Sequence, residues 1–446
     1  MQKNEEYILD IVGVTAEGSG VGRVDGMAVF VPLTAIGDRA KVKILKVKKT
    51  FAYGKLLSLV KPSKDRIQND CPCFNQCGGC VYRHISYGAE SQIKENKVYE
   101  NIKRIGGVDM PPMPIVTCNP ERYRNKAQYP LSLDGKVGFY AFHSHRIIPC
   151  EDCFLEPQIF SNITKCVEKW AKEFDISIYD ENTNKGSLRH VYIRKAEKTG
   201  EIMVCLVING EILPESDALV DLLLSVCGDS LKSVVININK KDTNVILGEK
   251  CKTVYGGDCI TDILCGVKIR LSPLSFYQVN HAMAEKLYGK AAEYAKPQGK
   301  NIIDLYCGAG TIGLSMAKEA NSIIGVEIVP EAIEDAKHNA KINGIENARF
   351  ICADATTAAK QLAKEGIAAD TVIVDPPRKG CSEEVIETIA HAFKPESVVY
   401  VSCDSATLAR DIKIFSQNGY KLKEYTPCDL FPRTSHVETV VLLCKG

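Results

Sequence analysis

The chain has 446 residues, of which 45% are hydrophobic and 25% are charged. This composition suits a globular protein of about three domains and excludes a disordered, collagen-like or coiled-coil chain. Lys and Arg (56) nearly balance Asp and Glu (55), so the net charge of +1 does not by itself indicate a nucleic-acid partner.

The cysteine content is high, with 19 cysteines in the chain. Residues 1–6 lack the apolar core of a signal peptide. No uncharged apolar run reaches the roughly 18 residues that a membrane span needs. We therefore expect a cytoplasmic protein without a membrane partner, in which clustered cysteines indicate metal binding or catalysis rather than disulfides.

Residues 1–60 predict a small β-barrel of the oligonucleotide-binding type. Short apolar runs at 7–14, 27–31, 40–47 and 51–60 are separated by glycines, which is the spacing of strands and turns.

A local basic stretch runs from Arg39 to Arg66, where ten Lys or Arg residues accompany a single acid, Asp65, for a local charge of +9. Lys41 and Lys43 alternate with apolar residues and should therefore lie on the outer face of one strand. This face is either a solvated surface or a patch that contacts RNA phosphates.

Residues 61–285 predict a mixed α+β central domain. A cysteine-rich segment at 67–82 precedes a helix over 86–105, which could pack on the domain that follows. Strands are expected at 190–194, 201–207 and 233–238. A helix over 160–173 should bury Trp170, the only tryptophan.

Residues 286–446 predict an α/β domain of the Rossmann-like type, so that the chain as a whole is an α/β multidomain protein. Strand-like segments at 301–305, 322–327, 348–352, 371–375 and 397–403 alternate with helical patterns. Such an alternation indicates a parallel sheet with helices on both faces. The last two strands, 420–427 and 436–444, have no helix between them and predict a terminal antiparallel hairpin.

A glycine-rich loop from Gly308 to Gly313 follows the first of these strands. It matches the dinucleotide fingerprint, and Glu327 lies 19 residues past Gly308, where an acid could bind ribose. Asp304 before the loop and Asp354 after the third strand add two more acids at the same sheet edge. Three acids suit the cationic groups of S-adenosylmethionine better than a dinucleotide, although a nicotinamide cofactor stays an alternative.

Two motifs at the same edge indicate the reaction centre. Asp375-Pro-Pro-Arg378 follows the fourth strand, where amino-group methyltransferases hold an amine against the prolines and usually continue with an aromatic residue. Cys403 ends the fifth strand, where it is either a buried packing residue or a nucleophile.

One reaction that would use a nucleophilic thiol at this edge is the methylation of uracil at C5, which requires both a thiol and a base. C5 is a poor nucleophile until a thiolate adds at C6, and the C5 proton must then be removed. Cys403 supplies the thiol. Glu438 and His436 alternate along the last predicted strand and should lie on one face of it.

The motifs together resemble the RNA uracil-C5 methyltransferase family of the RumA/TrmA type. The resemblance covers essentially the whole chain, since residues 1–60 are similar to the family's TRAM domain. It rests on segments that occur in the family's order: 71–80 (Cys-x5-Cys-Gly-Gly-Cys), 304–311 (Asp-Leu-Tyr-Cys-Gly-Ala-Gly-Thr), 375–378, 402–404 (Ser-Cys-Asp) and 436–438 (His-Val-Glu).

The resemblance implies roles for individual residues. The nucleophile falls on Cys403, followed by Asp404 where the family usually has Asn, and the base falls on Glu438. Arg124 and Lys126 fall on the family's RNA-contact motif. The cofactor contacts fall on Gln278, Tyr306, Thr311, Glu327 and Asp375. Asp354 is added to this set because of its position after the third strand.

The spacing of the cysteines alone does not identify a metal. Cys77 and Cys80 with Cys150 and Cys153 would make a zinc ribbon, and four thiolates equally suit an iron–sulfur cluster.

The resemblance implies a [4Fe-4S] cluster, structural or assisting RNA binding rather than generating radicals. Cys73 is then an extra cysteine, and Cys150 is an alternative for the fourth ligand. The implied ligands are Cys71, Cys77, Cys80 and Cys153.

The resemblance finally implies methylation of a uridine in 23S ribosomal RNA by a monomeric enzyme. The target base must be flipped out of the folded RNA to reach the thiol. Transfer RNA is the alternative substrate, and the barrel and cysteines favour the ribosomal branch. The remaining alternatives are an amino-group methyltransferase, a nicotinamide oxidoreductase and a non-catalytic iron–sulfur RNA-binding protein.

Overall fold

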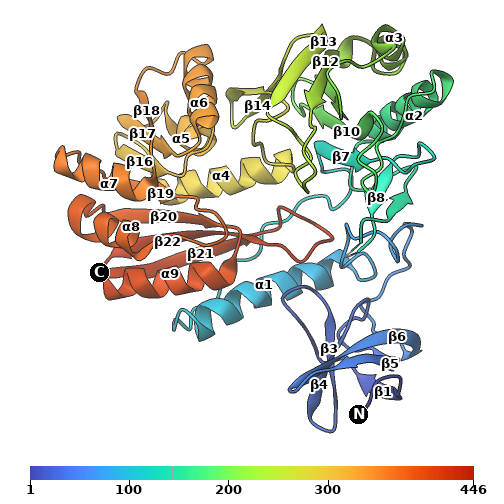
Figure 1. Cartoon of the computed structure of the whole chain (residues 1–446). Coiled ribbons are helices and arrows are strands. Elements are labelled where there is room, and N and C mark those ends of the chain that lie inside the picture. The colour runs from blue at the N-terminus through green and yellow to red at the C-terminus, as the bar shows by residue number, and fades with distance from the viewer. Residues whose placement is uncertain (143) are drawn as a thin grey trace.

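A computed structural model describes residues 1–142 and 144–446. An N-terminal barrel, a central domain and a C-terminal domain follow one another along the chain (Figure 1). Among the described residues, no helix has the length and apolar character needed to cross a bilayer.

The barrel strands follow the order β1-β5-β6-β4-β3-β2. Their bounds are β1 Glu6–Asp10, β2 Gly13–Val14, β3 Gly20–Val24, β4 Met27–Val31, β5 Arg39–Val47 and β6 Phe51–Lys61. β1 and β2 are consecutive in the chain but lie at the two ends of this order, where β1 pairs with β5 and β2 pairs with β3. The sheet therefore curls round into a barrel. The inside is apolar, with Val29, Val31, Val42 and Ile44 fully buried.

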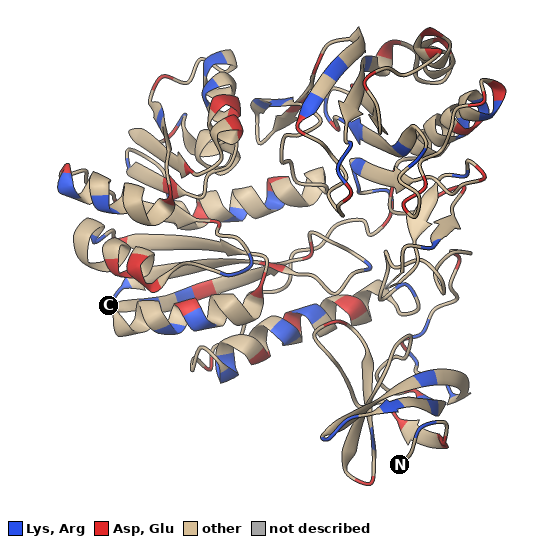
Figure 2. Cartoon of the chain, viewed as in Figure 1, with Lys and Arg blue, Asp and Glu red and all other residues tan. Residues whose placement is uncertain are grey.

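The basic strand β5 has the predicted alternation at its start. Lys41 is exposed, whereas Val42 and Ile44 are buried inside the barrel. Figure 2 shows several blue, basic segments on the barrel strands. Part of the local charge is neutralised within the protein. The ion pairs are Lys41–Glu6 (2.7 Å), Arg39–Asp10 (4.0 Å) and Arg66–Asp38 (2.7 Å).

Helix α1 (Tyr87–Arg104) lies between the barrel and helix α9 (Ser405–Gln417) of the C-terminal domain (Figure 1). It begins at the N-cap Ser86, whose hydroxyl accepts from the Ala89 amide at 3.3 Å. Asn101 Nδ2 donates to Ser405 Oγ at 2.8 Å. The helix therefore joins segments that lie 304 residues apart in the chain.

The central domain is built on a sheet in the order β13-β12-β11-β10-β7. Helices α2 (Gln158–Glu173) and α3 (Ser216–Cys227) pack on this sheet, and Trp170 of α2 is fully buried, as predicted. The strands are β7 Lys126–Pro130, β10 Leu188–Lys195, β11 Ile202–Ile208, β12 Leu231–Ile238 and β13 Lys250–Gly256. Two hairpins accompany the sheet: β8 (Gly138–Tyr140) with β9 (Ile147–Pro149), and β14 (Ile260–Leu264) with β15 (Val267–Leu271).

The C-terminal sheet has the order β18-β17-β16-β19-β20-β22-β21. The strands are β16 Asn301–Leu305, β17 Ser322–Glu327, β18 Ala348–Cys352, β19 Thr371–Val374, β20 Ser397–Ser402, β21 Tyr420–Cys428 and β22 Glu438–Lys445. The helices are α4 His281–Ala295, α5 Thr311–Met316, α6 Pro330–Ile342, α7 Ala355–Lys364, α8 Glu383–Thr388 and α9. A short helical turn, η2 Ile389–Phe393, directly follows α8, and another, η1 Gly228–Ser230, follows α3 in the central domain. Neighbouring strands from β18 to β20 are parallel, and β22 is antiparallel to both β20 and β21, as expected from the sequence.

Strand β16 is the topological switch point of this sheet. It pairs with β17 on one side and with β19 on the other. The chain runs outward from β16 through β17 to β18 and then crosses back to β19 on the opposite side of β16. Ligands of open α/β sheets bind in the crevice beside such a point, at the carboxyl ends of the strands.

The last strand is shorter at its start than predicted. β22 begins at Glu438, and His436 is an exposed residue of the preceding loop, so the expectation that both lie on one strand face is wrong. The physical reason is a local turn: the Thr434 amide and hydroxyl donate to the Phe431 carbonyl, and the His436 amide donates to Thr434 Oγ1. These bonds compete with the sheet ladder at residues 434–436.

Candidate active site

The predicted nucleophile and base meet at the carboxyl edge of the C-terminal sheet. In the antiparallel ladder of β20 and β22, Ser402 pairs with Thr439. Cys403 is the next residue after Ser402, and Glu438 is the residue before Thr439. The register therefore sets Cys403 and Glu438 side by side where β20 ends and β22 begins.

Burial and neighbouring charge make both groups weak acids. Burial, then Glu438 and Asp375, raise the pKa of the Cys403 thiol to about 11. The Glu438 side chain is almost fully buried, and burial followed by the charge of Asp375 raises its pKa to about 8. A carboxyl group with a pKa near neutrality is suited to proton transfer at physiological pH.

Arg378 is a member of this site that the sequence did not predict as a functional residue. Its guanidinium lowers the pKa of both Cys403 and Glu438. In the sequence, Arg378 differs only from the aromatic residue that amino-group methyltransferases usually have after the prolines. Its position directly after Asp375-Pro-Pro is the feature that could have indicated a role in the site. A cation beside a thiol favours the thiolate, which is the reactive form.

The glycine-rich loop is tied to two of the predicted acids. The Gly313 amide donates to Asp304 Oδ2 at 3.0 Å, and the Gly308 amide donates to Glu327 Oε2 at 3.2 Å. Asp304 is fully buried, and burial raises its pKa to about 7. Tyr306 has a φ of 67°, so the loop turns sharply as it leaves β16.

Thr311 and Gln278 come together on a residue that the sequence did not single out. Thr311 Oγ1 donates to the Tyr288 hydroxyl at 3.3 Å, and the Gln278 side chain is hydrogen-bonded to the same hydroxyl. Tyr288 belongs to α4 and is buried. Two predicted cofactor residues from distant segments thus share one partner.

The two remaining predicted acids differ in their surroundings. Burial raises the pKa of Asp375 to about 7, and its charge acts on both Cys403 and Glu438. Asp354 is exposed and is the N-cap of α7, where its Oδ1 accepts from the amides of Thr356 and Thr357. The helix cap is a structural role that the sequence interpretation of Asp354 did not include.

The predicted RNA-contact residues flank Asn125, which is hydrogen-bonded to the Gln278 segment. The Asn125 amide donates to the Val279 carbonyl at 2.8 Å, and its Nδ2 donates to the Gln278 carbonyl at 3.0 Å. Arg124 and Lys126 are therefore held next to a predicted cofactor segment. Burial, then the charges of Arg194 and Arg124, lower the pKa of Lys126 to about 8.

The loop that leads into Glu438 is fixed by buried charges of α1. Lys94 Nζ donates to Glu90 Oε1 and to Asp429 Oδ1, both at 2.7 Å, and to the Phe431 carbonyl at 3.1 Å. Lys94, Glu90 and Asp429 are all at most 1% exposed. A buried cation between two carboxylates holds the start of the loop against the helix.

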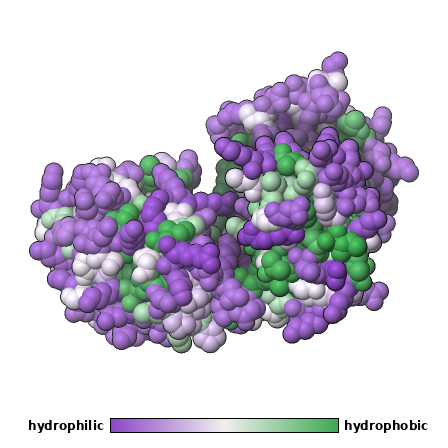
Figure 3. All heavy atoms as spheres, turned by 90° about the horizontal axis from the view of Figure 1, so that it is seen from below, coloured by the Kyte–Doolittle hydropathy of each residue, from purple (hydrophilic) through white to green (hydrophobic). Residues whose placement is uncertain are grey.

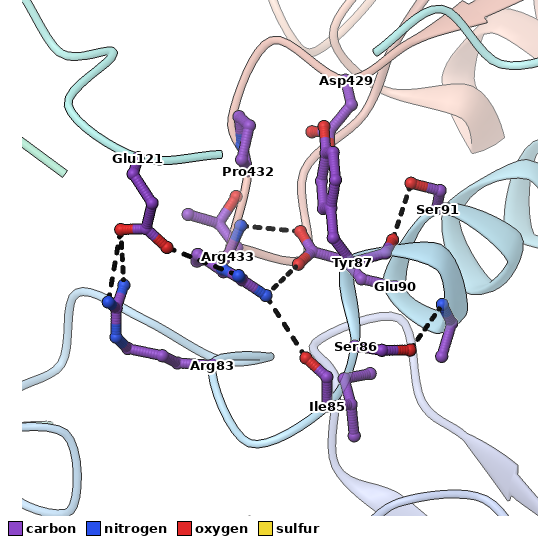
Figure 4. Close-up of polar contacts among 12 residues, drawn as sticks. Arg83, Ile85, Ser86, Tyr87, Glu90, Ser91, Glu121, Asp429, Pro432 and Arg433 are labelled. Atoms are coloured by element: carbon purple, nitrogen blue, oxygen red, sulfur yellow. Dashed lines mark hydrogen bonds and ion pairs between the residues drawn. The ribbon is translucent and has the colours of Figure 1, made fainter. Parts of the chain in front are cut away.

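Arg433 is the second anchor of this loop (Figure 4). Its backbone has a φ of 69°, and its carbonyl accepts from the Val81 amide at 2.6 Å and from the Tyr82 amide at 3.1 Å. Its guanidinium donates to the Ile85 carbonyl and to Glu121. The segment directly after Cys80 is therefore bonded to the loop that leads into the candidate base.

The cysteine segment packs against the β8–β9 hairpin. Cys77 forms a β-bridge with Ala141, and the Cys73 thiol donates to the Pro149 carbonyl at 3.5 Å. The Cys73 and Cys150 side chains are hydrogen-bonded to each other. All the predicted ligands are partly buried free cysteines, namely Cys71, Cys77, Cys80 and Cys153.

The cysteines suit an iron–sulfur cluster in residue type, because thiolates are its usual ligands. Burial raises the pKa of the Cys80 and Cys153 thiols; the charges of Cys77 and Cys71 raise that of Cys80 further, and the charge of Cys80 raises that of Cys153. Within the described residues, however, no three His, Cys, Asp or Glu side chains are arranged as a closed metal-ligand set. The thiols are neighbours without forming such a set.

The surface of the molecule has one broad hollow in the view of Figure 3. Seen from the side on which the barrel lies, the molecule is indented between the C-terminal domain and the body formed by the other domains (Figure 3).

Sequence comparisons agree with the resemblance drawn from the motifs. A family profile described as tRNA (uracil-5-)-methyltransferase matches residues 266–446, and a TRAM domain profile matches residues 2–57. The chain is 43% identical to an uncharacterized RNA methyltransferase of Clostridium acetobutylicum, over 99% of this chain and 98% of that protein. It is 42% identical to one of Halalkalibacterium halodurans, with the same coverage.

A solved structure is similar over nearly the whole chain. It is the tRNA (uracil-54, C5)-methyltransferase of Pyrococcus abyssi in complex with S-adenosyl-L-homocysteine, with a TM-score of 0.79 and 26% sequence identity. The match covers 98% of this chain and 100% of that one.

Proposed function

The chain belongs to the RNA uracil-C5 methyltransferase family, and on this basis we propose that it converts a uridine of structured RNA to 5-methyluridine with S-adenosylmethionine as the methyl donor. The observation that carries the proposal is the position of Cys403 and Glu438 next to each other at one sheet edge, one residue beyond the Ser402–Thr439 register pair. A thiol and a carboxyl are the two groups that the reaction requires.

The residues have distinct tasks. The Cys403 thiolate adds to C6 of the flipped-out uracil, which turns C5 into a nucleophile. Arg378 favours the thiolate through its positive charge. After methyl transfer, Glu438 removes the proton from C5, and the electron pair of that C–H bond restores the C5–C6 double bond as the thiolate leaves C6.

The cofactor contacts are proposed for Gln278, Tyr306, Thr311, Glu327, Asp354 and Asp375. When bound, S-adenosylmethionine supplies an electrophilic methyl group. The proposal is supported by the position of Tyr306, Glu327 and Asp375 at the carboxyl ends of β16, β17 and β19, and by the S-adenosyl-L-homocysteine in the similar Pyrococcus abyssi structure. Acids at this edge suit a cationic ligand.

The substrate proposed here is 23S ribosomal RNA, contacted through Arg124 and Lys126 near the catalytic edge and through the barrel. The cysteine motif is what supports the ribosomal branch. The barrel no longer discriminates, because the similar transfer-RNA enzyme of Pyrococcus abyssi matches 98% of this chain. Transfer RNA is therefore the second candidate, favoured by that match and by the family description.

The domain division proposed is a TRAM-like barrel over 1–60, a central domain over 61–285 and a catalytic domain over 286–446, with helix α4 (His281–Ala295) crossing the last boundary. A [4Fe-4S] cluster is proposed on Cys71, Cys77, Cys80 and Cys153, where its chemistry would be to hold two segments together. Support comes from the motif spacing and from the neighbourhood of the thiols.

The test of the proposed function is Cys403→Ala. Methyl transfer to RNA from labelled S-adenosylmethionine should vanish, while binding of S-adenosylhomocysteine, measured by calorimetry, should persist. Cys352→Ala is the matched control, because Cys352 also ends a strand at this edge but is exposed and lies outside the proposed site. Undiminished turnover in Cys403→Ala would sink the mechanism.

The substrate is assigned by mapping 5-methyluridine in ribosomal and transfer RNA from cells with and without the protein. Loss of the modification from 23S ribosomal RNA alone supports the first candidate. Loss from transfer RNA alone selects the second.

A further inference from the structure

A cluster of three aromatic rings lies on the outside of the barrel. The ring centroids of Phe30 and Phe51 are 5.2 Å apart, those of Phe51 and Tyr53 are 5.4 Å apart, and those of Phe30 and Tyr53 are 6.1 Å apart. Tyr53 is 42% exposed. Each ring contacts the other two, so together they form one continuous aromatic surface.

The register of the sheet explains why the rings face outward. β4 and β6 are parallel neighbours in which Phe30 is opposite Tyr53. The residues between the rings point into the barrel, since Val29 and Ala52 are fully buried. Alternation along both strands therefore places all three rings on the solvent side.

Cations border the aromatic surface. Lys46 of β5 is the register partner of Tyr53, and the Lys48 amide donates to the Phe51 carbonyl at 2.8 Å. Lys46, Lys48 and Lys49 are all exposed. Across the part of the chain that the structure describes, three cations of the basic stretch (residues 39–66) form ion pairs, and Lys46, Lys48 and Lys49 are not among them. The three are Arg39, Lys41 and Arg66.

Part of the unpaired positive charge of the barrel therefore lies beside the rings, carried by Lys46, Lys48 and Lys49. Pairing with acids neutralises the start of β5, whereas the turn after β5 keeps its charge. Single-stranded nucleic acids bind where a cationic track runs along stacking aromatic side chains. Aromatic pairs also stabilise sheets, but this role does not require three rings on a solvent-facing surface flanked by lysines.

We propose that Phe30, Phe51 and Tyr53 form a stacking platform for unpaired bases of the RNA substrate, with Lys46, Lys48 and Lys49 contacting the adjacent phosphates. The proposal rests on the proposed function in that it takes RNA as the ligand. It adds a site remote from the catalytic edge, which binds bases through their faces and is tolerant of sequence.

The experiment measures binding of the full-length protein to fluorescein-labelled oligocytidylate and to an abasic oligomer of the same length. Cytosine avoids the uracil site, and the abasic probe keeps the phosphates but offers no base to stack. Wild type should bind oligocytidylate more tightly than the abasic oligomer. Tyr53→Ala should weaken oligocytidylate binding about 5-fold to 160-fold, the range expected for one lost stacking contact, and leave abasic binding unchanged.

Variants separate stacking from charge and from folding. Tyr53→Phe should restore binding because it keeps the ring. Leu57→Ala is the matched control, since Leu57 lies on the same strand and is also 42% exposed but has no ring. Lys48→Ala should reduce the salt dependence of binding, with the slope falling by about 0.7 for one lost phosphate contact, which Tyr53→Ala should not do.

The outcomes are decisive in either direction. Equal affinity of wild type for the two probes, or a Tyr53→Ala variant that binds like Leu57→Ala, overturns the platform. These results do not depend on turnover. A wild-type protein that discriminates between the probes but does not methylate RNA would leave the platform standing and refute the proposed function instead.

Discussion

Arg433 and Glu90 contact each other twice: the Arg433 amide donates to Glu90 Oε1 at 2.6 Å, and its guanidinium lies 3.6 Å from Glu90 Oε2. Both side chains are buried. Helix α1 thereby binds the backbone and a side chain of the loop that leads into Glu438. The position of the candidate base is set by a helix residue that lies 343 residues before Arg433 in the chain.

Arg433→Met should destabilise the protein and slow methyl transfer. The variant leaves Glu90 buried without one of its positive partners, and breaking a buried ion pair costs about 3–5 kcal/mol. Urea unfolding measures the free-energy change, and initial rates measure the loss of activity.

Two comparisons isolate the effect of Arg433. Adding Glu90→Gln to Arg433→Met removes the unpaired charge and should recover part of the stability. Arg104→Ala breaks the exposed pair Arg104–Glu100 of the same helix and should have little effect. A stability of Arg433→Met equal to that of Arg104→Ala would show that the anchor is unimportant.

Glu438→Gln should trap a covalent adduct of protein and methylated RNA. The amide that replaces the carboxylate cannot take the C5 proton, so the bond between Cys403 and C6 is not released. The adduct is detected as a shifted band on a denaturing gel and should be absent from the double variant with Cys403→Ala. Normal turnover by Glu438→Gln would assign the base elsewhere.

The rate of methyl transfer should rise with pH, more steeply below about pH 8 than above it. Below its pKa of about 8, Glu438 is protonated and cannot accept a proton, and above this pH it is ionised. The Cys403 thiol, with a pKa of about 11, gains thiolate throughout the range. The profile of kcat/KM from about pH 6 to 9 checks this, and a flat profile across that range contradicts it.

Cys77→Ser and Cys153→Ser should lose protein-bound iron and sulfide, whereas Cys73→Ser and Cys150→Ser should retain them. The reason is that the first two are proposed cluster ligands and the others are extra thiols, hydrogen-bonded to each other. Iron analysis of anaerobically purified protein measures the difference. Retention in Cys153→Ser with loss in Cys150→Ser would move the fourth ligand to Cys150.

Much of the C-terminal domain could be predicted from the sequence. β16, β17 and β18 have the predicted bounds, and β19 and β20 end within one residue of them. Parallel strands that are covered on both faces have continuous apolar sequences, and the glycine and acidic residues that follow mark where these strands end. By contrast, β13 (Lys250–Gly256) is a largely exposed edge strand with no apolar pattern, and it was not predicted.

The site could be predicted where chemistry restricts the residue type. The reaction needs a thiol and a base, which indicated Cys403 and Glu438. Contacts between distant segments could not be predicted in this way, because neither Tyr288 nor Arg433 belongs to a sequence motif that indicates a contact with another segment. Only the folded chain brings Tyr288 to Thr311 and Arg433 to Glu90.

Lys94 and Asp429, which share a 2.7 Å contact, are 335 residues apart in the chain. During synthesis, domains fold from the N-terminus as they emerge, so α1 is made long before its acidic partner. Lys94 must remain hydrated on the nascent helix until residues near Asp429 arrive. The same dependence means that a polypeptide interrupted before this loop cannot acquire a competent catalytic centre, however well its earlier domains have folded.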